Sequence, residues 1–182
     1  MKSLKNILTL VCLALVLKAC LGDKKTSSEV SASEVKTEST SNSLKAESEA
    51  KRLCETFPEA LIMKHNPDAI KIEKETQPIS NNCKIKLFYG KRDYDFWEGL
   101  VSAWESKSKD PFWQYNPERN AALYHKVEDV GEKAVFITNM NQLLILKNGI
   151  VYSITPPNNG RATNSGKLNK EIALEMAKHY NL

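Results

Sequence analysis

The sequence is short of the residues that build common catalytic and metal sites. It has three histidines among 182 residues, and none of His65, His125 and His179 pairs with a second ligand at helical spacing. It also lacks a glycine-rich phosphate loop and a Gly-x-Ser-x-Gly nucleophile elbow. These absences predict a protein that has no catalytic residue, no metal site and no cofactor.

The longest apolar run is too short to cross a membrane. Residues 7–17 are apolar apart from Thr9, and this run falls short of the roughly 20 residues that a transmembrane helix needs. Residues 1–5 precede it with two lysines and no acid. A basic segment followed by a short apolar run is typical of a cleavable secretory signal. A core helix is disfavoured because it would alternate polar and apolar faces.

The apolar run ends in Leu17-Lys18-Ala19-Cys20, which resembles the lipobox of bacterial lipoproteins. Leu17, Ala19 and Cys20 fit that pattern, whereas Lys18 occupies a position that is usually uncharged. The resemblance implies that residues 1–19 are a signal peptide and that Cys20 is acylated on its thiol and its amino group. Each buried CH₂ group contributes about 0.8 kcal/mol, so two or three acyl chains anchor a protein stably.

Little net charge remains after residues 1–19 are removed. They hold three of the 26 basic residues and no acid, which leaves 23 basic against 22 acidic residues. A nearly neutral chain gives no electrostatic case for binding nucleic acid. Because the charge is so low, we expect the lipid on Cys20, and not electrostatic attraction, to hold the protein to the cell membrane or the outer membrane. There it faces the periplasm or the cell surface.

Composition divides the rest of the chain into a tether and one domain. Residues 20–48 are rich in Ser, Thr, Glu and Lys and contain no aromatic residue. Such a segment cannot bury enough apolar surface to offset the entropy of ordering, so we predict a disordered tether. Residues 49–182 are predicted to form a single domain, because this length is sufficient for a hydrophobic core.

Two cysteines remain for the domain. One of the four lies in the signal segment and Cys20 carries the lipid, so Cys54 and Cys83 form an even pair in an oxidising compartment. Cys54 falls in a helix expected over residues 46–54, and Cys83 opens a strand expected over residues 83–89. We predict a disulfide between them. Free buried thiols are the alternative, and two cysteines without a nearby histidine are too few for a metal.

The hydrophobic periodicity predicts an α+β domain with an antiparallel sheet, a C-terminal meander and helices packed on one face. Asn148-Gly149 is typical of a type I′ turn, because both residues of that turn need a positive φ. Asn139-Met140-Asn141 is expected to form the other turn of the meander. The other expected elements are a helix over residues 57–66 with Thr56 as its N-cap, a C-terminal helix over residues 168–180, and strands at residues 70–74, 134–137, 143–146 and 150–154.

A further helix is predicted in the middle of the domain. Phe96, Trp97, Leu100 and Trp104 recur at helical spacing, which indicates an amphipathic helix over residues 94–106. In this interpretation Trp97 and Trp104 fill the core between the helix and the sheet.

The segment over residues 110–117 is expected to be a loop that is dense in aromatic side chains. Phe112, Trp113 and Tyr115 lie in it among polar residues and prolines. Tryptophan and tyrosine are favoured at binding hot spots, so these three are candidate binding residues for a protein, a peptide or a glycan. Packing into the core is the alternative for Trp113 and Tyr115.

Two stretches resemble small, mostly uncharacterised lipoproteins of the bacterial cell envelope. The first is Cys54 beside a helical Glu-Ala-Leu segment, together with Cys83 at the start of a strand. The second is residues 127–136 (Val-Glu-Asp-Val-Gly-Glu-Lys-Ala-Val-Phe), which resembles a valine–glycine–acid–alanine run that leads into a hairpin. The resemblance implies the fold class and an envelope location, and it carries no catalytic residue.

These observations favour a non-catalytic binding or interaction module, anchored to the envelope through lipid. One alternative is an envelope hydrolase whose active site has no recognised motif. Another is a structural or assembly lipoprotein without a ligand. A concave pocket that holds two or more convergent titratable groups would contradict the binding module, and a flat domain with Trp113 and Tyr115 buried would weaken both the binding module and the hydrolase.

Overall fold

The computed structural model describes residues 35–158 and 166–182. The predicted signal peptide, Cys20 and residues 20–34 of the predicted tether lie outside the described residues.

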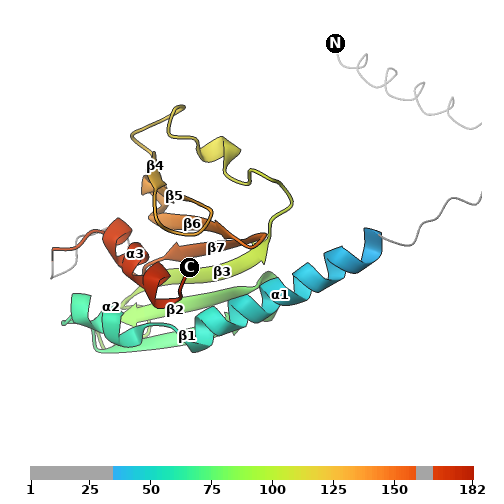
Figure 1. Cartoon of the computed structure of the whole chain (residues 1–182). Helices are drawn as coiled ribbons and strands as arrows, with labels where there is room; N and C mark the ends of the chain where they lie inside the picture. Colours follow the sequence, from blue (N-terminus) through green and yellow to red (C-terminus); the bar gives the residue numbers. More distant parts are fainter. Residues whose placement is uncertain (1–34, 159–165) are drawn as a thin grey trace, which may run out of the picture. The chain divides into compact units, whose positions relative to one another are not determined.

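Seven strands and three helices build the described domain (Figure 1). The strands form one antiparallel sheet in the order β1-β2-β3-β7-β6-β5-β4. The predicted α+β class with an antiparallel sheet is therefore confirmed. In chain order the elements are α1 (Val35–Glu55), α2 (Glu59–His65), β1 (Lys71–Gln77), β2 (Asn82–Phe88), β3 (Phe96–Glu105), β4 (Tyr124–Val127), β5 (Lys133–Ile137), β6 (Gln142–Lys147), β7 (Ile150–Thr155) and α3 (Asn169–His179).

The strand order forces one long connection to cross the sheet. Strands β1 to β3 are neighbours in sequence, as are β4 to β7, and the two groups join where β3 pairs with β7. Strand β4 lies at the outer edge, beyond β7, β6 and β5. The connection from β3 to β4, residues 106–123, must therefore travel from the middle of the sheet to this edge. We call it the crossing loop.

Tight turns with left-handed residues close the β5-β6-β7 hairpins. Asn148 and Gly149 have φ values of 51° and 75°, as the predicted type I′ turn requires. Asn141, with φ of 51°, ends the short 3₁₀ turn between β5 and β6. Both predicted turns are thus at the expected positions.

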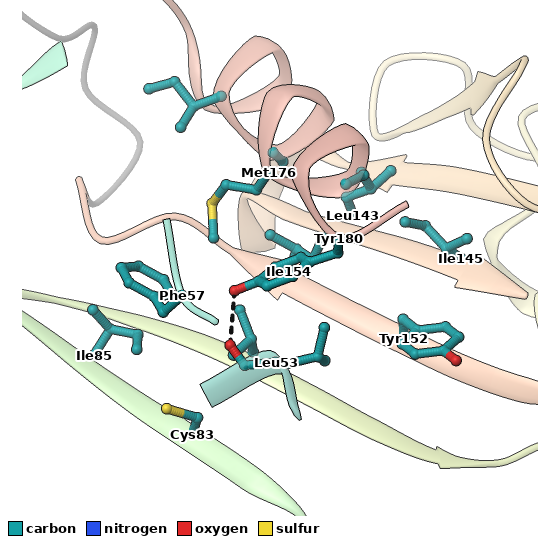
Figure 2. Packing of buried hydrophobic residues seen from close by; sticks show 14 of the residues in the cluster. Leu53, Phe57, Cys83, Ile85, Leu143, Ile145, Tyr152, Ile154, Met176 and Tyr180 are labelled. Atoms are coloured by element: carbon teal, nitrogen blue, oxygen red, sulfur yellow. Dashed lines mark hydrogen bonds between the residues drawn. The ribbon is translucent and has the colours of Figure 1, made fainter. Parts of the chain in front are cut away.

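One face of the sheet packs against α1 and α3. Leu53 of α1, Ile154 of β7 and Met176 of α3 are completely shielded from solvent in this core. Figure 2 shows the side chains that meet there, and the Tyr180 hydroxyl donates a hydrogen bond of 3.0 Å to the Leu53 carbonyl oxygen. The C-terminal helix is thereby fastened to the end of α1.

A disulfide joins Cys54 at the end of α1 to Cys83 of β2, with a Cα–Cα distance of 5.3 Å. The predicted pairing is confirmed. Both cysteines are buried in the core between α1 and the sheet. Cys83 points to the same face of β2 as Ile85 and Leu87.

The helix predicted over residues 94–106 is wrong, because this segment is the central strand β3. Both faces of β3 are covered along part of its length, so the consecutive residues Val101, Ser102 and Ala103 are all buried. A strand buried on both faces loses the alternation that identifies strands in a sequence. Trp97 is only half-buried and Trp104 is 40% exposed, so the expected filling of the core by Trp104 is also wrong.

The start of the domain also differs from the prediction. Helix α1 begins at Val35, whereas a helix was expected only over residues 46–54 and the residues before it were assigned to the disordered tether. Ala46 is 1% exposed, and together with Ala50 and Leu53 it forms a buried stripe at helical spacing. Small side chains on one face let a mostly polar helix lie close to the sheet.

The region after α1 was only partly predicted. Helix α2 begins at Glu59, so the predicted N-cap at Thr56 is wrong. The Thr56 hydroxyl instead donates a 2.8 Å hydrogen bond to the Arg52 carbonyl oxygen and closes the last turn of α1. Strand β1 also extends three residues beyond its predicted end at Lys74.

Candidate functional site

The crossing loop is fastened to the sheet by one aromatic side chain. Phe112 is 2% exposed and packs on the face opposite the helices. Its side chain packs against Val135 of β5, Leu144 of β6 and Val151 of β7. The loop must cross these three strands to reach β4. Phe112 is therefore the structural anchor of the loop rather than an exposed contact residue.

Polar side chains within the crossing loop satisfy its backbone donors. The Asp110 carboxylate accepts a hydrogen bond from the Phe112 N–H at 3.1 Å. The side-chain oxygen of Asn116 accepts one from the Glu118 N–H at 3.0 Å, and that of Asn120 accepts one from the Ala122 N–H at 3.2 Å. Such local bonds fix a loop that has little regular structure. The loop thus presents its other side chains in a defined arrangement.

The turn between β4 and β5, residues 128–132, stands opposite the crossing loop. Val130 is buried in the main core, and the Glu132 N–H donates a 2.8 Å hydrogen bond to the Leu146 carbonyl oxygen of β6. Gly131 has φ of 59°, and a Cβ atom there would lie 2.5 Å from that carbonyl oxygen. Only glycine fits this close approach, so the sequence holds the turn against β6.

A cavity of about 620 Å³ lies between the crossing loop and the β4–β5 hairpin. This volume falls within the roughly 300–1,000 Å³ that is usual for small-molecule sites. One wall comes from residues 110–119 of the loop, and the other comes from residues 126–135. We call it the crossing-loop cavity.

The aromatic residues of the cavity are held at different depths. Trp113 is 59% exposed, and the Arg119 guanidinium lies 5.3 Å from the centroid of its ring. Tyr115 is half-buried and meets Tyr124 edge-on, with ring centroids 5.7 Å apart. Trp113 therefore offers a large apolar surface to a ligand, while Tyr115 is supported from behind by the sheet.

Ion pairs neutralise both lysines in the walls. Lys133 of β5 lies 2.7 Å from the Asp110 carboxylate, and this pair links the two walls of the cavity. The hydrogen bond from Lys133 holds the pKa of Asp110 below its usual range. Lys126 pairs with Glu128 at 3.0 Å. Both pairs are exposed, so they orient the side chains more than they stabilise the fold.

The ionisable groups that the described residues bring to the walls of the cavity are four carboxylates, two lysines, one arginine and one tyrosine. Among the described residues that line it there is no serine, threonine, cysteine or histidine. The lowered pKa of Asp110 also makes this carboxyl a poor general acid. Nowhere in residues 35–158 and 166–182 do three His, Cys, Asp or Glu side chains gather as metal ligands. Both lysines and two of the four carboxylates of the walls are engaged in ion pairs.

The structure brings Phe112, Trp113 and Tyr115, the three candidate binding residues, to one cavity. Their roles differ, because Phe112 packs inward whereas Trp113 faces solvent. Neither Arg119 nor the opposite wall was predicted to be part of a binding site. The run over residues 127–136, singled out by its resemblance to envelope lipoproteins, supplies most of that wall.

Two of the histidines hold helices together. His65 is 3% exposed, and its ring lies 2.9 Å from the Glu175 carboxylate, which joins α2 to α3. The His179 ring nitrogen lies 2.9 Å from the Thr56 carbonyl oxygen. Neither residue lines the crossing-loop cavity.

Comparisons with known proteins give no independent indication of function. No protein-family model matches the chain, and no significant match was found among curated proteins or among solved structures. Across the described residues, no helix is both long enough and apolar enough to span a bilayer.

Proposed function

We propose that this protein is a lipid-anchored lipoprotein of the bacterial cell envelope whose domain is a non-catalytic binding module. The lipobox-like Leu17-Lys18-Ala19-Cys20 supports the anchor. The disulfide between Cys54 and Cys83 supports an oxidising compartment, because such bonds are rare in the reducing cytosol of most cells.

The exposure of Trp113 carries the binding proposal. Trp113 is 59% exposed, and it borders a cavity of ordinary ligand size instead of standing alone on the surface. The neighbouring Phe112 already provides the packing that the loop needs. Trp113 is thus available for a partner.

The anchor is tested by replacing the proposed lipidation site. Cys20→Ala should move the protein from the membrane fraction to the soluble fraction and abolish labelling with radioactive palmitate. Cys12→Ala, in the apolar run, is the matched control and should leave both unchanged. Retention of the Cys20→Ala protein in the membrane fraction would contradict the anchor.

The binding role is tested with two exposed tryptophans. Trp104 is 40% exposed on β3 and does not line the cavity, so it is a matched control for Trp113. Detergent-solubilised full-length protein is used to capture cell-envelope material. Trp113→Ala should lose the captured material, whereas Trp104→Ala should retain it. Equal capture by both variants and the wild type would exclude the crossing-loop cavity as the binding site.

A further inference from the structure

We infer that the crossing-loop cavity binds an uncharged carbohydrate, a short stretch of a neutral glycan that stacks on Trp113. This inference rests on the proposed binding function and specifies its ligand.

The charges of the cavity are largely balanced by one another. The described residues that line it include three cations and four carboxylates: Arg119, Lys126 and Lys133, with Asp110, Glu128, Asp129 and Glu132. Both lysines are paired at 3.0 Å or less, and Arg119 lies over the Trp113 ring. The described walls thus hold one more carboxylate than cations, so a phosphate, a sulfate or an acidic polymer would meet a net negative charge and is disfavoured.

The polar groups of the walls suit hydroxyl groups. Carboxylates of Asp129 and Glu128 accept hydrogen bonds, whereas the Arg119 guanidinium donates them in a planar fork. A sugar hydroxyl both donates and accepts, so a ring with several hydroxyls can use the two kinds of group at once. The C–H face of the same ring is apolar and can cover an exposed indole such as Trp113.

The backbone of the walls is poorly suited to an extended peptide. Peptides that add to a sheet need a free strand edge, but β5 is already paired with β4 and β6. Edge strand β4 contributes only Lys126 and Val127 to the lining. The N–H groups of Phe112, Glu118 and Ala122 in the crossing loop are already bonded to its own side chains.

The test uses detergent-solubilised full-length protein and a panel of neutral oligosaccharides of glucose, N-acetylglucosamine, galactose and mannose. At least one should bind and shift the tryptophan fluorescence to shorter wavelength. Trp113→Ala should weaken its binding by about tenfold or more, as expected for a hot-spot aromatic, while Trp104→Ala should stay within about twofold. Raising the salt from about 0.05 M to 0.5 M should leave the affinity unchanged, because a neutral ligand is not screened.

The controls separate the ligand class from the binding function. Heparin and a lysine-rich peptide represent anionic and cationic ligands. The carbohydrate inference is overturned if no neutral oligosaccharide binds. It is also overturned if envelope material captured through Trp113 is destroyed by protease and survives periodate, which would leave the binding function intact. If Trp113→Ala changes neither capture nor oligosaccharide binding, the proposed function fails as well.

Discussion

Adjacent residues in the crossing loop have opposite roles, and this difference decides what each substitution should do. Phe112 is 2% exposed and its neighbour Trp113 is 59% exposed. We expect Phe112→Ala to lower the free energy of unfolding by about 3 kcal/mol, because it leaves a cavity beneath the loop. Trp113→Ala should lower it by less than about 1 kcal/mol. Urea unfolding monitored by circular dichroism measures both values.

A similar loss of stability for the two variants would contradict this assignment. A large loss for Trp113→Ala would mean that the indole packs against the fold rather than offering a surface to a ligand. A small loss for Phe112→Ala would mean that the crossing loop is held mainly by its ion pair with Lys133.

Two glycines with left-handed backbones offer a second comparison between single residues. Gly131 and Gly149 have φ values of 59° and 75°, but a Cβ atom meets the Leu146 carbonyl oxygen at Gly131 and nothing within 4 Å at Gly149. Gly149→Ala should cost about 1–2 kcal/mol, the strain of a left-handed L-residue. Gly131→Ala should cost clearly more, because the turn must also move away from β6. Equal costs in urea unfolding would show that the turn is not held against β6.

At the level of elements, the sequence was informative where one face of an element is exposed. Strand β2 alternates cleanly, and the Asn148-Gly149 turn follows from backbone preference alone. Strand β3 was mistaken for a helix because Phe96, Trp97, Leu100 and Trp104 recur at helical spacing, although none of the four is fully buried. Local periodicity cannot reveal that a second layer covers the other face. In the same way, α1 was predicted too short because its buried stripe consists partly of alanines.

The disulfide determines how α1 is held to the sheet. Cys54 and Cys83 are separated by 29 residues, and closing a loop of this length reduces the entropy of the unfolded chain. We expect the double variant Cys54→Ala/Cys83→Ala to lose about 3.5 kcal/mol of unfolding free energy. Urea unfolding with and without dithiothreitol checks this value.

The double variant also serves as the control for reduction. Dithiothreitol should destabilise the wild type and leave the double variant unaffected, since the variant has no bond to reduce. Wild-type stability that does not respond to the reductant, with reduction verified by thiol counting, would show that packing alone holds α1.

On the scale of the whole molecule, the candidate site is a product of topology. The aromatics of residues 110–117 could be picked out from composition, but the cavity requires the crossing loop to meet the β4–β5 hairpin. That meeting follows from the pairing of β3 with β7, which separates β3 from β4 by three strands. Long-range pairing of this kind leaves no local trace in a sequence. Lys133 and Asp110 therefore became recognisable as partners only in the fold.

The whole fold should also respond to alkaline conditions, because buried tyrosines hold its layers together. Burial raises the pKa of Tyr89 to about 12, with a smaller contribution from the charge of Asp68. Burial likewise raises the pKa of Tyr152 to about 12, and the nearby Glu49 adds to this effect. The Tyr152 hydroxyl donates a 3.0 Å hydrogen bond to the Glu49 carboxylate of α1. Ionising it would therefore place two negative charges side by side beneath the helix.

The sign of the pH dependence of stability follows from whether the folded or the unfolded chain loses the tyrosine protons first. Below the ordinary tyrosine pKa of 10.0, folded and unfolded chains both keep these protons, so the stabilisation is fully present. Between pH 10 and about 12 the unfolded chain loses them first, and the free energy of unfolding should fall as the pH rises. Tyr152→Phe should make this decline shallower. Urea unfolding at a series of alkaline pH values measures how steeply the free energy of unfolding falls with pH. Identical slopes for Tyr152→Phe and the wild type would show that Tyr152 does not link α1 to the sheet through Glu49.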